Sequence, residues 1–162
     1  MARTPLVGYR WAVTALLGVG VLSFGLWAHH MFTTGMPHLS ATLFSAASMA
    51  VAIPTGIQIF TWIATLWRGN VRFAVPTWFV LAFLAVFVLG GLTGVMLAVV
   101  PFDWQVHDTH FVVAHLHYVL IGGMVFPLFA ALYYWAPMVG GRPLSERLGR
   151  WACGLMFAGL NI

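Results

Sequence analysis

Four of the histidines occur as two close pairs, and these pairs are the residues best suited to chemistry. His115 and His117 lie in one apolar stretch and are separated by a single residue. On a helix this spacing corresponds to about 200° of rotation, so the two imidazoles should leave opposite faces and cannot share one metal ion. Because ionisable side chains inside an apolar span are costly, they are functional by default. The pair predicts two separate centres, one on each side of a helix; hydrogen bonds to neighbouring helices are the alternative.

The second pair, His29 and His30, is adjacent in sequence at the end of another apolar stretch. Neighbouring side chains diverge by about 100° on a regular helix, so these imidazoles can converge only where a helix end unwinds. Imidazole suits copper, zinc and iron. Taken alone, such a pair is more typical of interfacial histidines at a helix end.

A third combination, His107 with Asp108, lies shortly before the stretch that carries His115. A carboxylate beside an imidazole suits a hard or borderline cation, or anchors a propionate through hydrogen bonds. An aspartate close to a helix start is more often an N-cap, so this motif is weak by itself.

Long apolar runs must position these side chains. Of the 162 residues, 62% are hydrophobic and 6% are charged, whereas soluble domains carry about 25% charged residues. A membrane-spanning helix needs about 20 apolar residues. We therefore expect an all-α, polytopic transmembrane bundle with four complete spans and the start of a fifth, forming a single membrane segment over residues 1–162 without separate domains. The runs cover Trp11–Ala28, Thr42–Trp67, Phe73–Val100, Phe111–Pro137 and Trp151–Ile162.

Charge is distributed unequally between the two ends of the expected bundle. All seven cationic side chains are arginines, and they fall in three clusters that alternating helices place on one side. The positive-inside rule makes that side cytoplasmic, and every histidine falls in or near the loops of the other side. The net charge of +4, without any lysine or basic stripe, excludes a nucleic-acid partner. The single cysteine, Cys153, excludes a disulfide framework.

Taken together, these motifs resemble subunit I of the haem-copper terminal oxidases, and the cytochrome c oxidase group in particular. The resemblance covers essentially the whole chain, as an internal or truncated segment from the family's seventh transmembrane helix into its eleventh. Four ordered strings carry it: His29–Gly35 (HHMFTTG), Ile53–Gly56 (IPTG), Gly90–Gly94 (GGLTG) and His107–Tyr118 (HDTHFVVAHLHY).

The resemblance implies a role for each ligand residue. His29 and His30 would be two of the three ligands of the active-site copper. His115 would be the axial ligand of the high-spin haem, and His117 one axial ligand of the low-spin haem. The implied magnesium site at the subunit interface would use His107 and Asp108, and Asp103 matches a carboxylate position near the haem propionates.

Two positions depart from the family pattern. Gln58 stands where the commonest branch has a lysine in a proton channel, so a proton path here would depend on waters and the Thr55 hydroxyl. His110 stands where tyrosine is usual. The third copper ligand and the other low-spin haem ligand belong upstream of the family segment, so the chain alone should not turn over.

The implied function is reduction of dioxygen to water with proton pumping, in a multi-pass protein of a bacterial cytoplasmic membrane. Its partners would be oxidase subunits II and III, with cytochrome c as electron donor. A quinol oxidase of the same superfamily is the nearer alternative. A non-catalytic, truncated membrane haem protein is an alternative from a different class, although an adjacent pair and a back-to-back pair of histidines fit it poorly.

Overall fold

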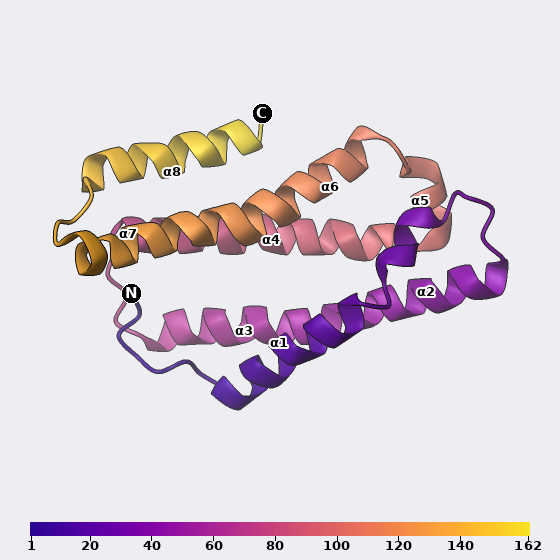
Figure 1. Ribbon diagram of the computed structural model, residues 1–162, viewed down its shortest axis with the longest axis horizontal. Helices are drawn as coiled ribbons and strands as arrows, with labels where there is room; N and C mark the ends of the chain where they lie inside the picture. The colour runs from indigo at the N-terminus through magenta and orange to yellow at the C-terminus, as the bar shows by residue number, and fades with distance from the viewer.

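The computed structural model describes residues 1–162 and is entirely helical. Ten helical elements follow one another along the chain, and Figure 1 shows how they are arranged. Their bounds are α1 (Tyr9–Ser23), η1 (Trp27–Met31), α2 (His38–Ala50), α3 (Ala52–Arg68), α4 (Val75–Leu97), α5 (Val100–Val106), α6 (His110–Leu120), η2 (Ile121–Val125), α7 (Phe126–Gly140) and α8 (Glu146–Leu160).

Three helical stretches are long and apolar enough to cross a membrane: His38–Arg68, Val75–Leu97 and His110–Gly140. The first joins α2 to α3, with only Val51 between them. Pro54 lacks a backbone donor and its ring opposes the preceding turn, which accounts for the interruption. Thr55 offsets part of this loss, because its backbone N–H and its hydroxyl both donate to the Val51 carbonyl, at 3.2 and 2.9 Å. The predicted all-α membrane bundle is confirmed.

The first apolar run differs from the expected complete span. It forms a helix of 15 residues, α1, and then a turn and the 3-10 helix η1. The amide of Gly25 donates to Leu22, and that of His29 donates to Leu26, so the hydrogen bonds close over three residues instead of four. This tighter winding ends α1 and places His29 and His30 on η1.

The helices form two groups (Figure 1). In one, α1 lies along α3; in the other, α4 packs against α6, α7 and α8. The second group contains the main core, in which Val75 and Phe79 of α4 meet Phe126 and Ala130 near the start of α7. The loops that follow α3 and α7 lie at one end of the bundle, whereas η1 and α5 lie at the other. The arginine-bearing and histidine-bearing ends are therefore opposite, as the sequence predicts.

Candidate metal centre

His29 and His30 converge at the histidine-bearing end. Their Nε2 atoms lie 3.1 Å apart and the ring planes are inclined by 54°. Two ligands at about 2.05 Å from one metal, with an angle between 90° and 109°, would be separated by roughly 2.9 to 3.4 Å. The observed separation fits that range. The non-α winding of η1 is what allows adjacent residues to do this.

The ring of His29 is oriented by Ser48 of α2. The Ser48 hydroxyl donates to the Phe44 carbonyl at 2.6 Å, so its oxygen accepts from His29 Nδ1 at 2.9 Å. This arrangement puts the imidazole proton on Nδ1 and leaves a lone pair on Nε2, which faces His30 Nε2. Burial, followed by the neighbouring His30, lowers the pKa of His29 to about 4. His29 is therefore neutral at pH 7, the state that binds a metal ion.

His115 lies against α4. Its Nδ1 donates to the Gly90 carbonyl at 3.0 Å and lies 3.1 Å from the Thr93 hydroxyl, which itself donates to the same carbonyl. Gly94 makes room for the ring, since a Cβ atom at that position would lie 2.8 Å from His115 Cε1. The glycine spacing of α4 therefore lets an imidazole on α6 sit against the α4 backbone with Nε2 free.

His117 faces the other side of α6. Its Nδ1 donates to the Val113 carbonyl at 2.7 Å, one turn earlier. The side chain lines a hollow of about 600 Å³ together with Met156, Gly159 and Leu160 of α8. His115 therefore faces α4 and His117 faces α8, which are the opposed faces that the sequence predicts. The following π-helical turn, η2, is of a kind found frequently at functional sites.

His107 is held by a different carboxylate from the one the motif suggests. Its Nδ1 is 2.8 Å from Asp103 Oδ2, and the Asp103 side chain is almost fully buried. The side chain of Asp108 is 95% exposed, and its Oδ1 lies 3.9 Å from His107 Nε2. Asp103 and His107 are four residues apart at the end of α5, so the helix brings them together. Asp108 has a positive φ of 58° and projects outwards.

Trp104 ties this region to the His29–His30 segment. Its indole nitrogen donates to the Phe32 carbonyl at 3.0 Å, immediately after η1. Sequence reasoning missed this contact, as well as the roles of Ser48, Thr93 and Gly94. Two signals for these roles were present in the sequence. One was a hydroxyl on an apolar helix, and the other was the four-residue spacing of Gly90 and Gly94.

Gln58 is buried on α3, and its amide nitrogen has no hydrogen-bond partner. Pro54 and Thr61, on the same face of α3, lie opposite Gly18 and Gly8 of the α1 region. Gln58 therefore faces the bundle interior, beside the small residues of α1. No group of three or more His, Cys, Asp or Glu side chains gathers as a complete metal site.

The fold and these side chains define a helical membrane protein with histidine side chains concentrated at one end. The family model described as cytochrome c and quinol oxidase polypeptide I matches residues 1–162, and the chain belongs to this family. It is 48% identical to cytochrome c oxidase subunit 1 of Bacillus subtilis (strain 168), over 99% of this chain and 26% of that protein. Identity to cytochrome c oxidase subunit 1 of Synechocystis is also 48%, over 99% of this chain and 29% of that protein. Quinol oxidase subunit 1 of Bacillus subtilis (strain 168) is 45% identical, over 99% of this chain and 25% of that protein. The chain spans about a quarter of the length of these relatives.

Proposed function

We propose that the chain is part of the catalytic subunit of a respiratory cytochrome c oxidase, which reduces dioxygen to water and pumps protons. One observation carries the proposal: His29, His115, His117 and His107 each bind a hydroxyl, carbonyl or carboxylate oxygen through Nδ1. Metal-ligating histidines characteristically make such a bond with the nitrogen that does not bind the metal. Their Nε2 atoms are therefore the expected ligand atoms.

The cofactors follow from the family and fit the donor sets. His29 and His30 would hold copper, with a third ligand from outside this segment. The high-spin haem would bind Nε2 of His115, and the low-spin haem Nε2 of His117 in the hollow beside α8. These groups supply the redox chemistry when bound. The protein residues fix the orientation of the His29, His115 and His117 rings through hydrogen bonds to Nδ1.

The remaining donor set is His107 with Asp108, which would contribute to a magnesium site completed by subunit II. Asp103 would position the His107 ring for that site and lie near the haem propionates. Subunits II and III are the further partners, and cytochrome c is the electron donor. The arginine-bearing end would face the cytoplasm of a bacterial inner membrane, because arginines accumulate on that side.

Oxygen consumption by the complete enzyme tests this function. Membranes that contain the complex should consume oxygen with reduced cytochrome c, and cyanide should stop the consumption. A quinol oxidase is the second candidate, because quinol oxidase subunit 1 is among the similar relatives. Activity with a quinol and none with reduced cytochrome c would establish that candidate instead. Failure with both donors would contradict the proposal.

Thr55 and Gln58 are proposed to line a hydrated proton path that lacks a titrating lysine. In the complete enzyme, Gln58→Leu should slow proton uptake and turnover, because it removes a side chain that can hold a water. The same change should leave thermal stability equal or higher, since an unpaired buried amide costs about 1–3 kcal/mol. Thr55→Val should act in the same direction. Unchanged proton uptake in both variants would leave these residues only a structural role at the Pro54 kink.

A further inference from the structure

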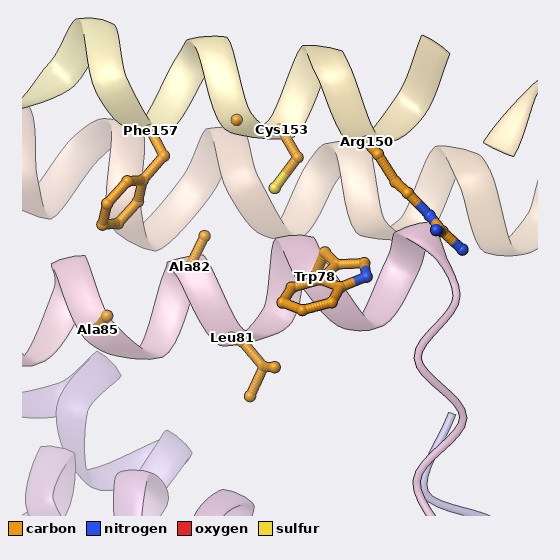
Figure 2. Close-up of a pocket in the computed structure, with 8 residues that line it drawn as sticks. Trp78, Leu81, Ala82, Ala85, Arg150, Cys153 and Phe157 are labelled. Atoms are coloured by element: carbon orange, nitrogen blue, oxygen red, sulfur yellow. The ribbon is translucent and has the colours of Figure 1, made fainter. Parts of the chain in front are cut away.

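A groove between α4 and α8 lies apart from all the histidines. It has a volume of about 530 Å³, and six of its eight lining residues are hydrophobic. Figure 2 shows that Trp78 and Arg150 flank one end and that Ala85 and Phe157 flank the other. Polarity therefore changes in one direction along the groove, from a guanidinium and an indole to aliphatic and aromatic carbon.

Both α4 and α8 begin at the arginine-bearing end. The distance that the groove reaches into the membrane can therefore be counted along α4 from that end. Pairs of lining residues keep a constant offset along the two helices: Trp78 with Arg150, Ala82 with Gly154 and Ala85 with Phe157. From Trp78 to Ala85 the groove extends roughly 10 Å along α4, at 1.5 Å per residue. This is about two thirds of the hydrocarbon thickness of one leaflet, which is about 15 Å.

The small residues on both walls create the space. Ala82 and Ala85 have short side chains and leave space on the α4 side of the groove. On the α8 side, a Cβ atom at Gly154 would meet nothing within 4 Å. This apolar surface can hold a hydrocarbon chain that lies along the helices. A soluble ligand would find no polar partner beyond the first turn.

The polar end suits an anionic headgroup. Arg150 is 60% exposed, and its only acidic neighbour is Glu146, at 3.8 Å. An exposed ion pair of this length contributes little, so it does not prevent a phosphate from binding the guanidinium. One carboxylate oxygen of Glu146 also accepts from the Val75 amide, at 3.2 Å, which holds it at the start of α4. The Trp78 indole nitrogen lies on the side of Arg150 and can donate to the same phosphate (Figure 2).

We propose that this groove binds one anionic phospholipid from the leaflet at the arginine-bearing end. Arg150 and Trp78 bind the phosphate, and one acyl chain lies between Ala82, Ala85 and Gly154. Tryptophan is enriched at the headgroup level, and the cytoplasmic leaflet is rich in anionic lipid. This inference is independent of the oxidase activity, because it concerns the opposite end of the bundle from the histidine ligands.

The test uses the complete oxidase in nanodiscs, with spin-labelled phosphatidylglycerol and phosphatidylcholine as probes. The wild-type protein should immobilise phosphatidylglycerol in preference to phosphatidylcholine. Arg150→Gln should weaken the phosphatidylglycerol interaction about five-fold, the effect of one arginine at an anionic surface. Arg147→Gln removes the same charge from the same helix without altering the groove lining, so it should retain the immobilised lipid.

Gly154→Leu tests the contribution of the groove separately from that of the Arg150 charge. The leucine side chain enters open space, so it should displace the acyl chain while Arg150 remains, and the immobilised component should be lost without a fall in thermal stability. Equal immobilisation of both lipids would overturn the proposal. So would retention of bound lipid in both Arg150→Gln and Gly154→Leu. A groove that immobilises no lipid even in the wild type, because another segment of the complete protein fills it, would overturn it as well.

Discussion

Replacing His30 with alanine in the complete oxidase is expected to remove copper from the enzyme and abolish oxygen reduction. His29 and His30 present Nε2 atoms 3.1 Å apart, and in the proposed site each would supply one copper ligand. Losing an outer-shell partner of a metal ligand costs about 10–100-fold in metal affinity or activity. We expect His30→Ala to reduce copper affinity and activity by more than this 10–100-fold range, since a proposed ligand itself is lost. Copper analysis of the purified complex measures the effect directly.

Two further variants should have smaller effects on copper content and activity than His30→Ala. Ser48→Ala removes the oxygen that accepts from His29 Nδ1 and leaves both ligands, so it should fall within the 10–100-fold range. His38→Ala removes an exposed imidazole at the same end of the bundle and should retain copper and activity. Full copper occupancy in His30→Ala would show that the pair is only an interfacial feature of a helix end.

Gly94→Ala is the second change with a large expected effect. Its new Cβ would lie 2.8 Å from His115 Cε1, so the ring must leave its position against α4 and lose the Gly90 carbonyl. We expect loss of the haem ligated by His115, or at least a 10–100-fold loss of activity. Haem content and the optical spectrum of the purified complex measure this change.

Gly91 provides the matched control on the same helix. A Cβ atom there meets nothing within 4 Å, and alanine is favoured over glycine within a helix by about 1 kcal/mol. Gly91→Ala should therefore keep both haem spectra and be equally or more stable. If Gly94→Ala and Gly91→Ala behave alike, the contact between α4 and His115 does not position a haem ligand.

The sequence predicted the parts of this molecule that depend on local rules. Apolar runs predicted the spanning helices, and the spacing of His115 and His117 predicted opposed faces. The shorter first helix was not predicted, because hydropathy does not distinguish α-helix from the 3-10 winding of η1.

Contacts between elements could not be predicted in the same way. The pairing of His107 with Asp103 depends on α5, a helix of seven residues that lay within a region expected to be a loop. The motif suggested Asp108 as the partner because it is adjacent in sequence, yet its backbone directs it outwards. Ser48 and Gly94 matter only because α2 and α4 approach particular histidines, which requires the packed structure.

We propose that α6 lies between two haems and supplies one histidine to each. Optical and electron paramagnetic resonance spectra of His115→Ala and His117→Ala in the complete oxidase test it most directly. His117→Ala should abolish the low-spin haem signal and leave the carbon monoxide-reactive haem. His115→Ala should spoil the carbon monoxide-reactive haem and leave the low-spin signal. Loss of the same haem in both variants would contradict the account.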